Sequence, residues 1–213
     1  SGAATRMFKA LYAFYADKDA EKIQSLEGLK DNGHEQVYHF FNNLHRFAFY
    51  QDLKETLKQG GMDMEKLLDE GAYQTILRFF LDEGLQYGSL PKGLLAFHSY
   101  EDSVRTPLEE HLVEAAHYAE ANGKARLHFT VSPEHRQGFT SLLENARPAY
   151  EQRFNTFFDV EFSEQKPSTD TVAVDVNNEP FRNTDGSIFF RPGGHGALIE
   201  NMNELDADIV FIK

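Results

Sequence analysis

Three short segments of the 213-residue chain combine a cationic side chain with glycine, proline or other small residues. The first segment runs Ser1-Gly2-Ala3-Ala4-Thr5-Arg6-Met7. A loop of small residues before a helix lets backbone N–H groups approach a phosphate, and Arg6 adds a planar cationic donor. The alternative interpretation is that Ser1-Gly2 is an expression remnant in front of an ordinary helix.

The second segment places a lysine on a constrained turn, Pro91-Lys92-Gly93. Proline and glycine on either side restrict the backbone, which fixes an ammonium group that would otherwise be mobile. A fixed ammonium can neutralise negative charge on a phosphate while the phosphate is transferred. The alternative is a solvent-exposed lysine in an ordinary turn.

The third segment is rich in glycine and runs Phe190-Arg191-Pro192-Gly193-Gly194-His195-Gly196. It follows a predicted strand and precedes a predicted helix. Glycines at such a position allow the backbone to approach another group closely, and its N–H groups would point toward an anion or a nucleobase carbonyl. The alternative is a tight strand-to-helix turn with no ligand.

Several other kinds of chemistry are excluded by the sequence. The chain has no cysteine, so it has no disulfide scaffold and no thiolate ligand or nucleophile. It contains neither a G-x-x-x-x-G-K-[ST] phosphate loop nor a G-x-S-x-G nucleophile elbow. His34, His39 and His45 are five and six residues apart, and His111 and His117 are six apart. Zinc ligands on one face of a helix are four apart, so neither group has the spacing of a helical zinc site.

The composition restricts the classes of partner that this protein can bind. Lys and Arg total 21 against 34 Asp and Glu, a formal net charge of −13, which repels a nucleic-acid backbone. A small anionic ligand is still compatible with this charge, because local cations dominate at short range. No apolar run approaches the roughly 18 residues of a membrane span, and no signal peptide is visible. We therefore expect a cytoplasmic protein that binds neither nucleic acid nor membrane.

The first 90 residues have the apolar spacing of helices. Recurrence of apolar residues every three or four positions predicts helices over residues 5–15, 34–58 and 73–81. Gly60-Gly61 is a predicted stop for the second of these helices, and Gly84 for the third.

The pattern changes after Gly88, where predicted strands alternate with predicted helices. Thr106-Pro107-Leu108-Glu109 is a capping box that starts a helix ending at Asn122-Gly123. Residues 125–131 alternate like a strand, and Ser132-Pro133 begins another helix that continues to about Ala149.

The last part of the chain contains further strand candidates. They are residues 157–162, 171–176 and 187–190, with Asn177-Asn178 and Asp185-Gly186 as turns. Residues 196–204 read as a short helix, and residues 209–212 as a buried parallel strand. The order of elements predicts an α/β fold, in three layers with a mainly parallel sheet covered on both faces. We expect one domain over residues 1–213, with a helical insertion over residues 19–88.

Together the three segments resemble motifs of the sugar-nucleotide pyrophosphorylases, most closely the UDP-sugar branch. That family has a Gly-rich loop ending in Gly-Thr-Arg-Met or Gly-Thr-Arg-Leu, where this chain has residues 2–7. It has a Pro-Lys-Gly turn, matched by residues 91–93, and a Gln after a strand, matched by Gln165. Its Gly-rich base-binding turn is matched by residues 192–196. The set of motifs also looks like the bacterial DUF4301 group, a domain of unknown function.

The resemblance implies a role for each matching residue. Gly2, Ala3, Ala4 and Thr5 would contact the nucleotide. Arg6 would stabilise the leaving pyrophosphate, and Lys92 would hold the α-phosphate. The nucleobase would be bound by Gln165, Gly193 and Gly194. Ribose or sugar phosphate would lie near Arg191, His195 and Gly196.

The resemblance further implies a nucleotide-diphospho-sugar transferase-like, Rossmann-like fold and a Mg²⁺-dependent reaction. A nucleoside triphosphate, UTP in preference, would be joined to a sugar 1-phosphate with release of pyrophosphate. About 85 residues separate Arg6 from Lys92 where the family has a short link, and these hold the predicted insertion. The family's metal-binding carboxylate follows the strand that here ends at Lys213. We therefore expect a fragment of a longer protein, with the Mg²⁺ ligand outside this chain.

Two alternatives belong to other functional classes. The first is a non-catalytic protein that binds a nucleotide or nucleotide sugar. The second is an interaction module in which the helices over residues 5–81 bind a partner protein.

Overall fold

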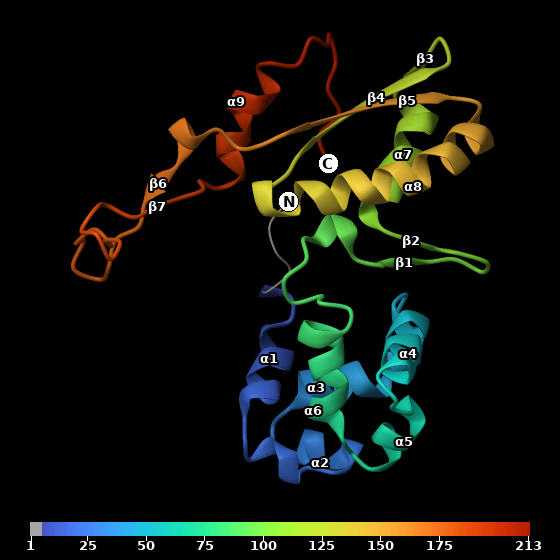
Figure 1. Ribbon diagram of the computed structural model, residues 1–213, viewed down its shortest axis with the longest axis vertical. Helices are drawn as coiled ribbons and strands as arrows, with labels where there is room; N and C mark the ends of the chain where they lie inside the picture. The colour runs from blue at the N-terminus through green and yellow to red at the C-terminus, as the bar shows by residue number, and fades with distance from the viewer. Residues whose placement is uncertain (1–5) are drawn as a thin grey trace.

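Two separate stretches of the sequence build two hydrophobic cores. The computed structural model describes residues 6–213, and its helices and strands confirm a mixed α/β protein. One core gathers buried residues from Phe8 to Leu95, and the other gathers those from Leu108 to Phe158. We call residues 8–95 the helical lobe and residues 98–163 the α/β body; they lie at the bottom and at the top of Figure 1.

The helical lobe consists of short helices. They are α1 (Lys9–Ala16), η2 (Ala20–Lys22), α2 (Leu26–Asp31), α3 (Glu35–Asn42), η3 (Leu44–Arg46), α4 (Tyr50–Gln59), α5 (Met64–Asp69), α6 (Tyr73–Arg78), the π-helical turn η4 (Phe79–Glu83) and η5 (Lys92–Leu94). Its core contains Phe8, which precedes α1, Leu11 and Phe14 of α1, and residues of the predicted insertion. One domain with an insertion over residues 19–88 stays a prediction.

The single helix predicted over residues 34–58 is wrong, because the chain breaks between α3 and α4. Asn43 lies at the end of α3, where its N–H and its side-chain Nδ2 both donate to the His39 carbonyl, at 3.2 and 2.9 Å. Phe47 then adopts an extended conformation, with φ −76° and ψ 144°. The break lets the Phe47 ring stack on Phe40 and on Phe49, with centroids 5.4 and 5.1 Å apart.

The α/β body begins with a short hairpin and then alternates helices with strands. Its elements are β1 (His98–Ser99), β2 (Val104–Arg105), α7 (Pro107–Tyr118), β3 (Glu120–Ala121), β4 (Lys124–Thr130), η6 (Pro133–His135), α8 (Arg136–Phe154) and β5 (Phe157–Ser163). The predicted capping box is confirmed: Thr106 Oγ1 accepts from the Glu109 N–H at 3.3 Å, and Glu109 Oε2 accepts from the Thr106 N–H at 2.8 Å.

The largest sheet of the described residues has three strands in the order β3-β4-β5. β4 and β5 are parallel, with Lys124 opposite Phe157 and Thr130 opposite Ser163, whereas β3 is antiparallel to β4. The three-layer, mainly parallel sheet that we expected is therefore not confirmed. Both parallel strands alternate apolar and polar residues, and such strands bury one face only.

Helices cover only the apolar face of this sheet in the α/β body. α7 packs against β4 and α8 packs against β5, and the core between them contains Leu112, Phe139 and Phe158. Pairs of polar side chains occupy the other face: Lys124 Nζ lies 2.8 Å from an Asp159 carboxylate oxygen.

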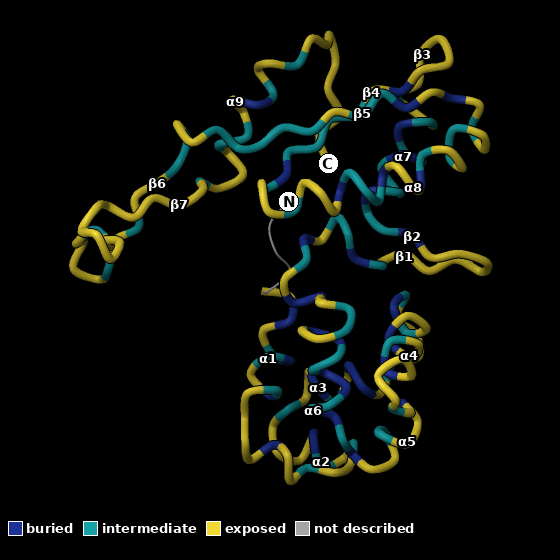
Figure 2. Tube along the Cα trace, viewed as in Figure 1, coloured by how far each residue is buried: buried dark blue, intermediate teal, exposed yellow. Residues whose placement is uncertain are grey.

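Residues 167–191 form an arm that projects to the left of the α/β body in Figure 1. It contains η7 (Pro167–Thr169), β6 (Thr171–Val172) and β7 (Phe190–Arg191), and is followed by η8 (His195–Leu198) and α9 (Ile199–Met202). Both predicted strands of the arm are thus shorter than expected, although β6 and β7 pair antiparallel. Most of the arm is exposed in Figure 2.

The prediction of a buried parallel strand over residues 209–212 is wrong. The segment is not in a strand, and Ile209 and Ile212 are 76% and 72% exposed. It lies beside the α/β body, where Arg126 Nη1 donates to the Asp206 carbonyl at 2.9 Å and Phe211 contacts the ring of Tyr118. Among the described residues, no helix is long and apolar enough to cross a membrane.

Candidate functional site

Four of the predicted site residues, Gly2, Ala3, Ala4 and Thr5, lie outside the described residues. Arg6 is exposed in the turn that precedes α1. Lys92 is exposed at the first position of η5, and η5 packs against α7 and α8. Pro91 therefore places Lys92 where the helical lobe meets the α/β body.

Gln165 and Gly193 are brought together, although they are 28 residues apart. Gln165 follows the end of β5, and with its amide oriented so that donors face acceptors, Oε1 accepts from the Gly193 N–H at 2.7 Å. In the same orientation Nε2 donates to the Gly193 carbonyl at 3.3 Å, and Oε1 also accepts from Thr169 Oγ1 at 3.1 Å. The glutamine thus holds the Gly-rich turn at the carboxyl end of a parallel strand.

The glycines of this turn differ in the space around them. A Cβ on Gly193 would lie 2.7 Å from the Thr169 carbonyl oxygen, so only glycine fits there. A Cβ on Gly194 or Gly196 would meet no atom within 4 Å. Packing inside the described chain therefore does not require glycine at these two positions, and the backbone beside the exposed His195 is open to approach.

The structure does not join all of the predicted residues into one site. Arg6 and Lys92 make no hydrogen bond or ion pair with any other predicted site residue in the part of the chain that is described. Arg191 lies in β7, where it is exposed and pairs with Thr171. Two cations beside Gln165 are already paired: Arg136 lies 3.2 Å from Glu164, the residue before Gln165, and Lys166, the residue after it, pairs with Glu204.

A cluster of polar side chains that the sequence patterns did not predict surrounds Ser163, the last residue of β5. Ser163 Oγ lies 2.7 Å from His128 Nε2 and 3.2 Å from Thr130 Oγ1, and it accepts from Asn201 Nδ2 at 2.9 Å. Asn201 of α9 is only 3% exposed, and its Nδ2 also donates to the Glu164 carbonyl at 2.8 Å. We call these four residues the Ser163 cluster. Alternation in the two strands was the available signal, but it does not give the register that joins them.

The described residues contain no group of three His, Cys, Asp or Glu side chains that could hold a metal ion. A protein-built Mg²⁺ cage therefore does not fit this part of the chain. Mg²⁺ in phosphate-transferring proteins is commonly held through substrate phosphates and water, with only one or two carboxylates. A Mg²⁺ ion beside the described residues would therefore take most of its ligands from other sources, such as water.

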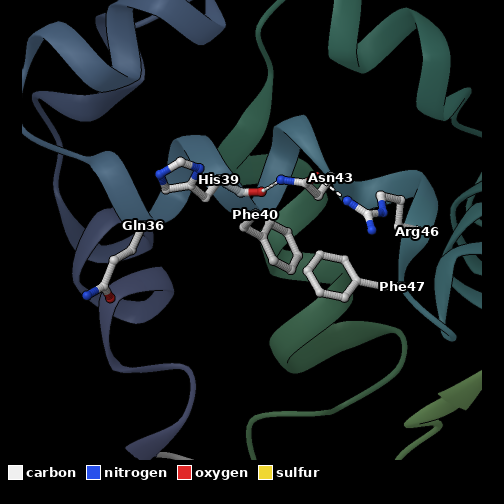
Figure 3. A pocket seen from close by; sticks show the side chains of 6 residues that line it. All are labelled: Gln36, His39, Phe40, Asn43, Arg46 and Phe47. Carbon is white, nitrogen blue, oxygen red and sulfur yellow. Dashed lines mark hydrogen bonds between the residues drawn. The ribbon is translucent and has the colours of Figure 1, made fainter.

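A groove of about 660 Å³ lies apart from these residues, on the helical lobe (Figure 3). It is lined by Gln36, His39, Phe40, Asn43, Arg46 and Phe47. The Phe40 ring is nearly buried, whereas Phe47 is 38% exposed and forms an apolar wall. Arg46 Nη1 donates to Asn43 Oδ1 at 3.3 Å, which fixes the guanidinium beside the rings.

Comparison with known proteins gives one match. The model of a family described as "Domain of unknown function (DUF4301)" matches residues 1–213. No match was found among curated proteins or among solved structures. The predicted relation to UDP-sugar pyrophosphorylases thus stays a prediction, whereas the match over the whole chain confirms that this protein belongs to the DUF4301 family.

Proposed function

We propose that this chain is a nucleotidyltransferase that joins a nucleoside triphosphate, UTP in preference, to a sugar 1-phosphate. The observation that supports the proposal is the contact between Gln165 and the Gly193 backbone at the carboxyl end of the β4–β5 pair. Ligands of parallel sheets bind outside the carboxyl ends of the strands. Kinship with UDP-sugar pyrophosphorylases, and the three-layer fold of that family, belong to the same proposal.

In the proposed reaction a phosphate oxygen of the sugar phosphate attacks the α-phosphorus of the nucleotide. The bond from that phosphorus to the bridging oxygen breaks, and pyrophosphate leaves with the electron pair. No residue forms a covalent intermediate, so catalysis depends on positioning and on neutralising charge. Lys92 would contact the α-phosphate and Arg6 the leaving group, with Mg²⁺ entering on the nucleotide.

Gln165 needs a specific role in this proposal, because its amide is satisfied by Gly193 and Thr169. We assign it the positioning of the Gly-rich turn, which leaves the open backbone of Gly194 and Gly196 to face the base. A nucleobase could also displace Gly193 from the amide.

The proposal is tested by thermal stabilisation of the full chain with UTP, dTTP, ATP, GTP and CTP, each with and without Mg²⁺. A nucleotide at 100 times its dissociation constant adds about 2.7 kcal/mol, or roughly 5–10 °C in Tm for a chain of this size. We expect UTP with Mg²⁺ to give the largest shift. The absence of a shift with every nucleotide, in folded protein, would refute the proposal.

Lys92→Ala gives a prediction for one residue. Because Lys92 is exposed and unpaired among the described residues, the variant should fold normally and lose most of the UTP-induced shift. Lys58→Ala is the matched control, since Lys58 is an exposed lysine of α4. Equal shifts in the two variants would remove Lys92 from the site.

Pyrophosphate release separates the catalytic function from the non-catalytic alternative. An enzyme should release pyrophosphate from UTP when sugar 1-phosphates are added. A binding protein should show the same thermal shift with UTP or a nucleotide sugar and release none.

The groove on the helical lobe favours a second candidate function, the binding of a partner protein. An exposed aromatic wall beside fixed polar groups is typical of such surfaces. Replacing Phe47 with serine should then leave nucleotide binding unchanged. Should no nucleotide bind the full chain, this candidate becomes the stronger one.

A further inference from the structure

The Ser163 cluster contains two buried polar atoms without a hydrogen-bond partner in the described structure. They are His128 Nδ1 and Asn201 Oδ1. Buried polar atoms are almost always hydrogen-bonded, so each such exception requires an explanation. Both side chains already use their other polar atom on the same oxygen, Ser163 Oγ, so the two unpartnered atoms belong to side chains that meet at one hydroxyl.

The chemistry of these atoms defines the group that would satisfy them. Asn201 Oδ1 accepts a hydrogen bond only. His128 Nδ1 carries a proton when Ser163 donates to Nε2, and it then donates. A hydroxyl group can donate to the first atom and accept from the second. A sugar ring carries several neighbouring hydroxyls. It therefore also fits an arrangement in which His128 Nδ1 and Asn201 Oδ1 each contact a different hydroxyl.

The position of the cluster connects it to the proposed nucleotide site. Asn201 holds the carbonyl of Glu164, the residue between Ser163 and Gln165. The cluster therefore lies at the same carboxyl end of the parallel pair as the contact between Gln165 and Gly193.

A side chain that can move lies next to His128 Nδ1. The nearest charged group is Glu161, whose carboxylate lies 3.6 Å from Nδ1, beyond hydrogen-bond distance. Glu161 is 62% exposed, so it can rotate into solvent when a ligand arrives.

We propose that the Ser163 cluster binds a sugar hydroxyl of the ligand, with His128 Nδ1 and Asn201 Oδ1 as the two contacts. The inference rests on the proposed function and extends it to the sugar. The hydroxyl comes either from the ribose of the nucleotide or from the hexose joined to it. Ser163 then acts as a positioning residue that orients the imidazole through Nε2, and Thr130 contacts Ser163.

Two substitutions of His128 separate ligand binding from structure. Glutamine places its amide near the position of Nε2, which retains the contact with Ser163 and removes Nδ1. Asparagine places its amide near Nδ1 and loses the contact with Ser163. His98→Gln is the control, because His98 is an exposed histidine in β1.

Calorimetric titration of each protein with Mg-UTP, Mg-2′-deoxy-UTP, UDP and UDP-glucose tests the proposal. We expect His128→Gln to weaken one ligand about tenfold and His128→Asn to stay within about twofold of the wild type. If His128→Gln weakens the binding of UTP but not that of 2′-deoxy-UTP, the hydroxyl belongs to the ribose. If the substitution weakens the binding of UDP-glucose but not that of UDP, the hydroxyl belongs to the hexose.

Two results would overturn the inference, and they are distinguishable. Nucleotide binding that is unchanged in His128→Gln refutes the sugar contact alone, since water would then satisfy both atoms. Absence of any nucleotide binding in the wild type refutes the proposed function and the sugar contact with it.

Discussion

Tyr87 shows how strongly the core of the helical lobe surrounds a single polar group. The residue is 6% exposed and packs against the rings of Phe49 and Phe80. Its hydroxyl oxygen accepts a hydrogen bond from the Ala96 N–H at 3.0 Å. Burial is the main cause that raises the pKa of Tyr87 from 10.0 to about 12.

This shift predicts a loss of stability at alkaline pH. The unfolded chain releases the phenolic proton near pH 10, whereas the folded chain retains it until about pH 12. Stability from this group is therefore complete below pH 10 and falls as the pH rises toward 12. Tyr87→Phe should cost about 1 kcal/mol at pH 8 through the lost hydrogen bond, yet show a shallower decline above pH 10.

Urea unfolding at several pH values between 8 and 11.5 measures both effects. Tyr118→Phe is the control, because that side chain is 43% exposed. Parallel curves for Tyr87→Phe and the wild type would contradict the prediction.

At this scale the sequence predicted some contacts and not others. Gln165 and Gly193 were expected in one site from their motifs, and they touch. His128 and Ser163 were not noticed, because they are 35 residues apart and meet only through the parallel register of β4 and β5. Periodicity gives the face of the sheet on which a strand residue lies, but it does not identify the residue opposite it on the neighbouring strand.

Among the elements, α8 contains an internal proline. Pro148 lies within the helix Arg136–Phe154, and it is exposed. Proline has no N–H, so the carbonyl four residues earlier, that of Glu144, loses its helical partner. Packing of Phe139 and Leu143 into the core keeps the helix formed in spite of this loss.

Pro148→Ala should therefore stabilise the protein by about 1–3 kcal/mol. Little packing is lost, because the ring is exposed. Denaturant unfolding measures the gain, and Asn145→Ala, another exposed site on α8, should change stability by only a few tenths of a kcal/mol. A destabilised Pro148→Ala variant would show that the proline is required by its neighbours.

Explicit start and stop signals predicted some element ends but not all: Asn122-Gly123, expected to end a helix, forms the turn between β3 and β4, and α7 ends at Tyr118. The capping box at Thr106 and the stop at Gly60 are both confirmed. Apolar spacing alone did not reveal the break at Asn43, because Phe40 and Phe47 fit one helical face as well as they fit a stack across a turn. The missing signal was the side-chain hydrogen bond of Asn43.

For the whole molecule, the decisive feature is the presence of two cores. Leu95 belongs to the core of the helical lobe, whereas the adjacent Leu94 packs against the core of the α/β body. The boundary between the cores thus falls within a single turn, η5, which also bears Lys92.

Separate cores predict two unfolding transitions. Leu53→Ala, fully buried in α4, should lower only the transition of the helical lobe; Phe158→Ala, fully buried in β5, should lower only the other. Each costs at least about 2 kcal/mol, or roughly 8 °C in Tm for a unit of up to 100 residues. Differential scanning calorimetry resolves the two. A single peak that either substitution shifts as a whole would show that the cores unfold together.

The mixture of helices and strands was visible in the sequence, but the layers were not. We expected two covered faces because helices alternate with strands after residue 90. The alternation of Arg126, Leu127, His128 and Phe129 within β4 already indicated a single apolar face, whereas the polar face is contacted by α9 through Asn201 and Ser163.

The exposed segment 209–212 has a consequence for how the protein behaves in concentrated solution. Four consecutive β-forming residues, each more than two-fifths exposed, resemble the short sequences that assemble into fibrils. Asp206 and Asp208 precede the run and Lys213 follows it, as gatekeeper charges do at aggregation-prone strands. Net charge keeps molecules apart over about 10 Å at 0.1 M salt and over only 3 Å at 1 M. High salt is therefore the storage condition under which this chain should first self-associate.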